Sequence, residues 1–165
     1  MCETNGKIVL SQKVQNIAES LDLSKDMVRN ILLNYIAYCR TMLIHGKRIE
    51  FLDMLYMCPD ILFDDYRTTL AYECKHVADE LHLPQHTVYV VVKAYLEDLE
   101  ADLIAGRPIE LRGLVAIKPV KKDNSYTIHS VTSPMVKKEI QDRQTVVQNV
   151  RCFTQKALKT KMALA

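Results

Sequence analysis

The sequence lacks the patterns that mark several common classes of protein. It has four glycines and no tryptophan in 165 residues, and no glycine-rich phosphate loop or nucleophile elbow occurs, so nothing supports an enzyme. No run approaches the roughly 18 to 20 uninterrupted apolar residues of a membrane span. The first seven residues also lack the basic-then-apolar order of a signal peptide, which predicts a protein of the cytoplasm or one assembled there.

Disulfide and metal-binding patterns are missing as well. The cysteines are odd in number, scattered and never in a CxxC pair: Cys2, Cys39, Cys58, Cys74 and Cys152. We therefore expect reduced thiols packed as small hydrophobes. His82 and His86 stand four residues apart but straddle Leu83-Pro84 at a helix start, so we expect no metal site there.

What the sequence does have is an internal repeat at a constant offset of sixty residues. Segment 44–51, IHGKRIEF, returns as segment 104–111, IAGRPIEL. Apolar positions upstream keep the same spacing, as do Pro59 and Pro119 downstream. A repeat of this kind indicates two copies of one supersecondary unit. Because such a unit usually cannot bury its apolar face alone, we expect the two copies to share a core.

Each copy predicts two helices followed by a β-hairpin. In the first copy, apolar residues at three- and four-residue spacing predict a short helix up to Leu21 and a longer one that Ser24 caps and that ends at Gly46. In the second copy, the longer helix begins near Pro84 and ends at Gly106. The valine-rich segment 88–92 has strand propensity, but the matching segment 28–32 alternates poorly, so the repeat favours a helix.

After Pro119 the second copy continues into a basic extension. Residues 121–165 carry nine Lys/Arg against three Asp/Glu, whereas residues 1–66 carry seven against nine and residues 67–120 carry six against eight. Segments 125–131 and 140–150 alternate or are β-branched on either side of Pro134. This pattern predicts a β-ribbon over about residues 120–150 with the proline near its tip, and residues 151–162 predict a short closing helix.

This order of elements resembles the HU/IHF family of bacterial DNA-bending proteins. Pro108–Lys118 resembles the family's strand-turn-strand, and Arg151–Lys159 resembles its closing segment. The resemblance extends over residues 67–162, and over residues 8–59 for the helices and hairpin alone. It implies an α+β pseudo-dimer of two tandem helix-helix-hairpin units, with a first repeat at 1–66 that lacks an arm. The second repeat, at 67–165, carries one arm (about 120–150) and a C-terminal helix.

The resemblance makes this arm the candidate contact site. Family arms end in a Gly-Arg-Asn-Pro-like tip whose proline wedges between base steps, and here only the proline is retained, in a tip formed by Ser133, Pro134 and Met135. A proline at a ribbon turn is also ordinary turn chemistry. Candidate contacts to phosphate or to an acidic partner are the cations of the extension: Lys121, Lys122, Lys137, Lys138, Arg143, Arg151, Lys156, Lys159 and Lys161. Lysines on a ribbon can also serve simply to keep its edge soluble.

Two functions remain open. A DNA saddle should present a broad cationic surface, because non-specific affinity comes from neutralising phosphates, yet both repeats are mildly acidic. We therefore expect a structural assembly protein, such as a ring component of a phage connector or tail, with protein partners in a homo-oligomer or larger assembly. It would reside in the cytoplasm of a bacterial host or in the virion. The alternative is an architectural protein that binds and bends DNA. Neither function needs a cofactor or a small-molecule substrate.

Overall fold

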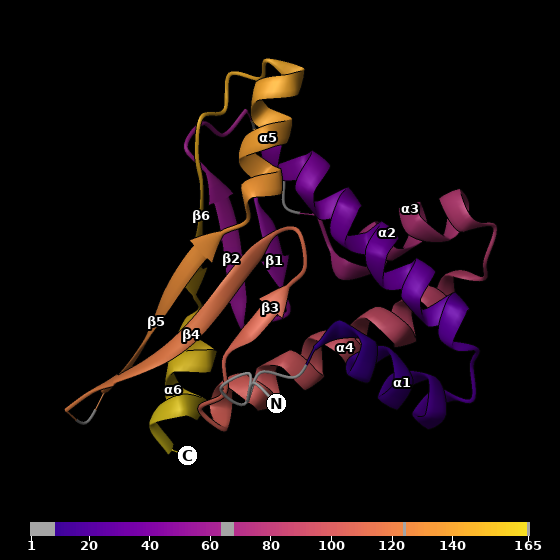
Figure 1. The fold of residues 1–165 in the computed structure, drawn as a ribbon, viewed down its shortest axis with the longest axis horizontal. Helices are drawn as coiled ribbons and strands as arrows, with labels where there is room; N and C mark the ends of the chain where they lie inside the picture. The colour runs from indigo at the N-terminus through magenta and orange to yellow at the C-terminus, as the bar shows by residue number, and fades with distance from the viewer. Residues whose placement is uncertain (1–8, 64–67, 124, 165) are drawn as a thin grey trace, which may run out of the picture.

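The chain is α+β, with four long helices on one side and the β-sheets on the other (Figure 1). The computed structural model describes residues 9–63, 68–123 and 125–164. Within those ranges the chain forms six helices and two three-stranded antiparallel sheets. In chain order they are α1 Leu10–Leu21, α2 Lys25–Ile44, β1 Ile49–Phe51, β2 Leu55–Pro59, α3 Leu70–Leu81, α4 Gln85–Ile104, β3 Ile109–Leu111, β4 Val115–Lys122, β5 Ser125–Thr132, α5 Pro134–Arg143, β6 Val150–Thr154 and α6 Lys156–Leu164.

The four long helices repeat with the predicted spacing. Helices α1 and α3 have 12 residues each and α2 and α4 have 20 residues each, and both pairs start sixty residues apart. Ser24 caps α2 by accepting a hydrogen bond from the Met27 amide at 3.2 Å, and Thr69 caps α3 through the Tyr72 amide at 3.1 Å. The valine-rich segment lies inside α4, which confirms the helical prediction.

The third strand of each sheet reveals a second repeat. The sheet orders are β1-β2-β6 and β3-β4-β5. Thr154 of β6 pairs with Leu55 and Thr132 of β5 pairs with Val115, so the third strands correspond at an offset of twenty-two residues. The same offset relates the buried residues of the closing helices, which are Val136 and Ile140 in α5 and Leu158 and Met162 in α6. Each unit is therefore helix-helix-strand-strand-strand-helix.

The second unit (α3, α4, β3, β4, β5 and α5) is inserted within the first unit (α1, α2, β1, β2, β6 and α6). The chain leaves the first unit at Pro59 and returns at Val150, and these two residues pair with each other. Pro119 and Ile128 pair at the matching place in the second unit, shortly before its hairpin turn. The predicted division at residue 66 therefore needs correction, because residues 150–164 complete the first unit rather than the second.

The predicted ribbon over residues 120–150 is wrong in its pairing and in its tip. Segment 125–132 is a strand, but it pairs with β4, and Asp123 lies at the turn; Asn124 lies outside the described residues. Ser133 instead caps α5 through the Met135 amide at 3.2 Å, and Pro134 lies in its first turn. A serine followed by proline favours a helix start. Residues 151–154 are also strand, so the closing helix begins at Lys156.

Both units contribute to one hydrophobic core, as the repeat predicted. Helix α1 of the first unit contacts α4 of the second, and α2 contacts α3. The closing helices cross between the units in the same way, since α5 packs on α2 and α6 packs on α4. Matching strand residues such as Ile49 and Ile109 are buried beneath the helices. The shared core holds the two sheets on the same side of the molecule (Figure 1).

Candidate interaction surface

The faces of the two sheets that point away from the helices lie next to each other. Strands β5 and β6 are in contact, and Thr132 Oγ1 donates a hydrogen bond to the Val150 carbonyl oxygen at 2.8 Å. Because side chains alternate along a strand, inward positions join the core and the positions between them face outward. The outward positions that correspond in the two sheets are Glu50, Tyr56, Cys58, Arg151 and Phe153 in the first and Glu110, Ala116, Lys118, His129 and Val131 in the second. The longer β4–β5 hairpin continues the same side with Val120, Lys122, Ser125 and Thr127. We call the ten corresponding positions the outer face.

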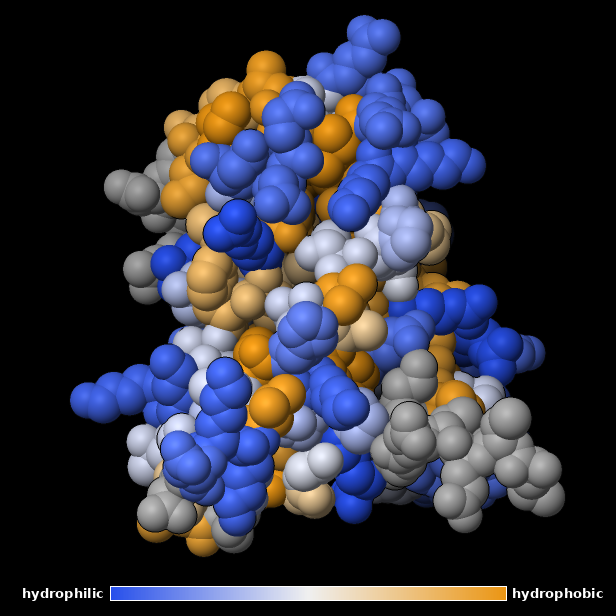
Figure 2. Space-filling view, turned by 60° about the vertical axis from the view of Figure 1, so that its left-hand side comes forward, coloured by the Kyte–Doolittle hydropathy of each residue, from blue (hydrophilic) through white to orange (hydrophobic). Residues whose placement is uncertain are grey.

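The outer face is more apolar and aromatic than cationic. Val131 is 57% exposed and Phe153 is 40% exposed. Of the ten positions, Lys118 and Arg151 are the lysines and arginines, and two glutamates balance them. Figure 2, which turns this side of the molecule forward, shows hydrophobic and neutral residues interspersed with hydrophilic ones across the view. This composition is typical of a protein-binding surface.

In the first unit two aromatic rings fill the outer face. The rings of Tyr56 and Phe153 are stacked, with centroids 5.1 Å apart and planes inclined by 22°. The guanidinium carbon of Arg48 lies 3.9 Å from the Tyr56 ring centroid, and Arg48 also forms an ion pair with Glu50 at 3.2 Å. We call the pair Tyr56 and Phe153 the aromatic knob. Cation–π contact and stacking fix its orientation.

In the second unit the matching positions are small. Ala116 stands sixty residues after Tyr56, and Val131 stands twenty-two residues before Phe153. Their small side chains leave a cavity of about 180 Å³ on the outer face. We call this cavity the hollow; its lining includes Glu110, Ala116, Val131, Ser133 and Pro134. The knob and the hollow are thus equivalent places in two units that have diverged in side-chain size.

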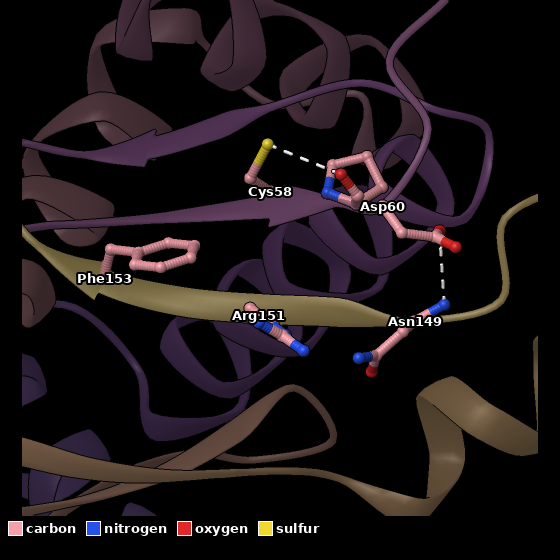
Figure 3. Close-up of a pocket in the computed structure, with 6 residues that line it drawn as sticks. Cys58, Asp60, Asn149, Arg151 and Phe153 are labelled. Atoms are coloured by element: carbon pink, nitrogen blue, oxygen red, sulfur yellow. Dashed lines mark hydrogen bonds between the residues drawn. The ribbon is translucent and has the colours of Figure 1, made fainter.

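A larger cavity, of about 270 Å³, lies where the chain enters and leaves the inserted unit (Figure 3). Its lining consists of Cys58, Pro59, Asp60, Asn149, Arg151 and Phe153. Asp60 Oδ1 accepts hydrogen bonds from the backbone amides of Gln148 and Asn149 at 3.0 and 3.2 Å. Burial alone would raise the pKa of Asp60, but these amides outweigh it and lower the pKa. Asp60 therefore fastens the two ends of the insertion together.

The hairpin of β4 and β5 is the most cationic part of the sheets. It carries Lys118, Lys121 and Lys122 towards its end, and Lys118 lies opposite His129. Alternation places Lys118 and Lys122 on the outer side of the hairpin and Lys121 on the inner side. The Lys121 Nζ lies 5.6 Å from the Tyr126 ring centroid. These lysines form a small local cationic site rather than a saddle.

The structure separates the other predicted phosphate contacts. Lys137, Lys138 and Arg143 are on α5, whereas Lys156, Lys159 and Lys161 are on α6, and Figure 1 shows these two helices at opposite ends of the molecule. Arg151 lies on β6, on the outer face. Lys161 is engaged within the fold, because its Nζ lies 2.7 Å from Glu100 Oε1. The predicted cations therefore do not form one continuous strip.

The predicted tip residues lie at the margin of the outer face instead. Ser133 and Pro134 line the hollow, and Met135 is 49% exposed. A Cβ atom added to Gly113, in the turn between β3 and β4, would lie 3.4 Å from the Met135 sulfur. These residues can still contact a partner, but as part of the sheet surface and not as a projecting tip.

The sequence pointed to Ser133 and Pro134 of the hollow, but not to Ala116 and Val131 or to the two residues of the knob. The available signal is the alternation of Leu55, Tyr56 and Met57, which places the tyrosine on the face opposite the two buried residues. Phe153 was missed because its strand was predicted as helix. The outward pattern becomes visible once the third strand of the first unit is known to come from the end of the chain.

The described part of the chain shows no constellation for catalysis by a bound metal. It contains no group of three or more His, Cys, Asp or Glu residues that could hold a metal ion. None of the described helices is long and apolar enough to span a membrane.

No family model matches the sequence, and no curated protein matches it. The surface itself therefore carries the functional argument.

Proposed function

We propose that this chain is a non-enzymatic structural protein that self-associates through its outer face. Its two nested units form an HU/IHF-like pseudo-dimer within one chain, and the scaffold serves protein contacts in place of DNA bending. The observation that carries this proposal is the exposed apolar and aromatic surface of the outer face, formed by Val131, Phe153 and the Tyr56 ring stacked on Phe153. Burial of such a face against another protein is favourable because apolar area leaves water.

The charge distribution supports protein contacts over a DNA saddle. Non-specific DNA affinity requires several cations on one continuous surface to neutralise phosphates. The cations on this side are divided between the two sheets, with Lys118 and Lys122 on the hairpin and Arg48 and Arg151 beside the aromatic knob, where Arg48 is already paired with Glu50. The hairpin turn carries Asp123, and Pro134, the candidate wedge, lies in the first turn of a helix. A repeating particle, such as a phage connector or tail ring, would suit such a protein, with the host cytoplasm and the virion as its locations.

DNA binding is the second candidate, and one observation favours it. Lys118, Lys121 and Lys122 are exposed together on the β4–β5 hairpin, and a cationic hairpin can contact phosphates along a groove. Such a hairpin would neutralise about three phosphates, which predicts a shallow dependence of affinity on salt.

A mass measurement on the full chain tests the proposal. We expect sedimentation over a range of concentrations to show self-association, and Val131→Asp to weaken it by at least about tenfold, because a charge would be buried in the interface. Leu33→Asp, at an exposed position of α2 on the helical side, is the matched control and should leave the mass unchanged. Titration with duplex DNA at two salt concentrations completes the test, since sub-micromolar binding by a monomeric chain, with the shallow salt slope expected for about three phosphates, would favour the second candidate.

A further inference from the structure

The knob and the hollow differ at three matched positions, and at each of them the first unit has the larger side chain. Tyr56, Phe153 and Gln155 of the first unit correspond to Ala116, Val131 and Ser133 of the second. Gln155 Nε2 donates to the carbonyl oxygens of Leu52 and Leu55 at 3.0 and 2.9 Å and so fills the space beside the knob. Ser133 is shorter and its hydroxyl turns to its own helix. The first unit therefore presents aromatic rings at positions where the second unit has small side chains.

The hollow has the size and lining to receive an aromatic ring. Its volume of about 180 Å³ exceeds that of a buried apolar cavity of about 150 Å³ that accepts benzene. Val131 is 57% exposed, and the covered ring would remove this apolar area from water. Phe153 is 40% exposed on the same side of the molecule. An exposed ring and an exposed hollow on one face are a complementary pair.

We infer that two copies of this chain associate face to face, with Phe153 of each copy seated in the hollow of the other. This inference rests on the proposed function and specifies its interface. The knob and the hollow lie on either side of the boundary between β5 and β6. A rotation of 180° about an axis along that boundary, within the plane of the face, places each knob over a hollow and closes the interface. The alternative axis, across the boundary, places knob on knob and leaves both hollows uncovered.

The charges around the two features favour the same arrangement. Arg151 neighbours Phe153 on β6, and Glu110 is part of the lining of the hollow. Seating the knob in the hollow brings Arg151 of one copy towards Glu110 of the other. Placing knob on knob would instead bring the arginines beside the rings together, which electrostatic repulsion disfavours. Shape and charge therefore select the same partner, a second copy of this chain.

Disulfide trapping in the full chain tests the arrangement. Val131→Cys and Phe153→Cys variants are prepared separately, each with Cys2 and Cys58 replaced by serine, then mixed and oxidised. We expect the mixed species, 131 joined to 153, to exceed both self-joined species, because a disulfide requires the two Cα atoms to lie within about 7 Å. Predominant 153–153 or 131–131 species from a chain that still self-associates would overturn this inference and leave the proposed function standing.

A second pair of variants uses no cysteine. Ala116→Tyr fills the hollow as Tyr56 fills the matching place, so we expect it to weaken self-association by at least about tenfold. Glu80→Tyr adds the same side chain at an exposed position of α3 on the helical side, and it should leave the association unchanged. Equal effects of the two variants would overturn the inference. A wild-type chain that remains monomeric at every concentration would overturn both this inference and the proposed function.

Discussion

Lys13 and Glu73 stand sixty residues apart, at matching positions of α1 and α3, and both side chains are buried. Lys13 Nζ donates to the carboxylates of Asp98 and Asp102 on α4. Glu73 instead accepts a hydrogen bond from Tyr35 Oη of α2 at 3.3 Å. Two copies of the second unit, paired with each other, would bring Glu73 towards the two aspartates. The buried charges therefore favour pairing of one first unit with one second unit.

Glu73 also makes stability depend on pH. Burial raises the pKa of its carboxyl from 4.5 to about 7, although hydrogen bonds from Thr68 and Tyr35 oppose the shift. Below pH 4.5 the carboxyl is protonated in both states. As pH rises towards 7 the unfolded chain ionises first, so stability falls, by about 3 kcal/mol in total. We expect Glu73→Gln to remove this part of the decline.

Urea unfolding of wild type and Glu73→Gln between pH 4.5 and 7.5 measures the effect. The informative quantity is the difference between the two free energies of unfolding, because other groups titrate equally in both proteins. Glu80→Gln, at an exposed position of the same helix, should follow the wild type. A difference that stays constant over this range would show that Glu73 is not protonated in the folded chain.

The closing helices α5 and α6 have also diverged, in the charges of the ion pairs that attach them to the other unit. Arg40 of α2 pairs with Glu139 of α5 at 2.7 Å, and Glu100 of α4 pairs with Lys161 of α6 at 2.7 Å. Arg40 and Glu100 match at the offset of sixty, and Glu139 and Lys161 match at the offset of twenty-two. The two equivalent ion pairs thus have opposite polarity. Each closing helix is complementary to the unit it packs on and would be repelled from the other's place.

Charge reversal at the better-buried pair tests this complementarity. Arg40 and Glu139 side chains are 13% and 24% exposed, so we expect Arg40→Glu to lower the free energy of unfolding by about 2 kcal/mol through loss of the pair and repulsion. Combining it with Glu139→Arg should recover most of that loss, because the pair is restored with its polarity exchanged. Thermal or urea unfolding of the two single variants and the double variant gives the coupling energy. Additive losses would mean that the pair does not select the partner.

The helices were predictable from the sequence, and the third strands were not. Apolar residues at helical spacing, a cap at Ser24 and a matching repeat specify α1 to α4 locally. The sequence predicts a strand over residues 125–131, and β5 lies there. Its pairing partner could not be predicted, because a local pattern does not specify which segment lies beside the strand. The helix cap formed by Ser133 and Pro134 is the local signal that indicates the start of α5. The five-residue strand β6 pairs with β2, which lies far earlier in the chain (Val150 with Pro59 and Thr154 with Leu55), so its partner could not be predicted from neighbouring sequence.

In the whole molecule, the insertion of the second unit within the first brings residues 150–164 back to the first unit. Strand β6 completes the first sheet, and the amide of Gln155 donates to the Met54 carbonyl oxygen at 2.9 Å. The matching bond in the second unit, from the Ser133 amide to the Leu114 carbonyl oxygen, is 2.8 Å long. The closing helix of each unit packs on the other unit, α5 on α2 and α6 on α4. Unfolding of one unit would therefore expose the core of both. We therefore expect the chain to unfold as one cooperative body.

Proline substitutions at two matched positions separate nested units from consecutive ones. Arg151 of β6 and His129 of β5 are exposed and correspond at the offset of twenty-two, so replacing either with proline disrupts a third strand without opening a cavity. We expect Arg151→Pro to speed amide hydrogen exchange in β2 by at least tenfold, equivalent to about 1.4 kcal/mol, while β4 keeps its protection. His129→Pro should do the reverse. If Arg151→Pro instead loosened β4 and left β2 protected, the end of the chain would belong to the second unit, and the nested arrangement would be wrong.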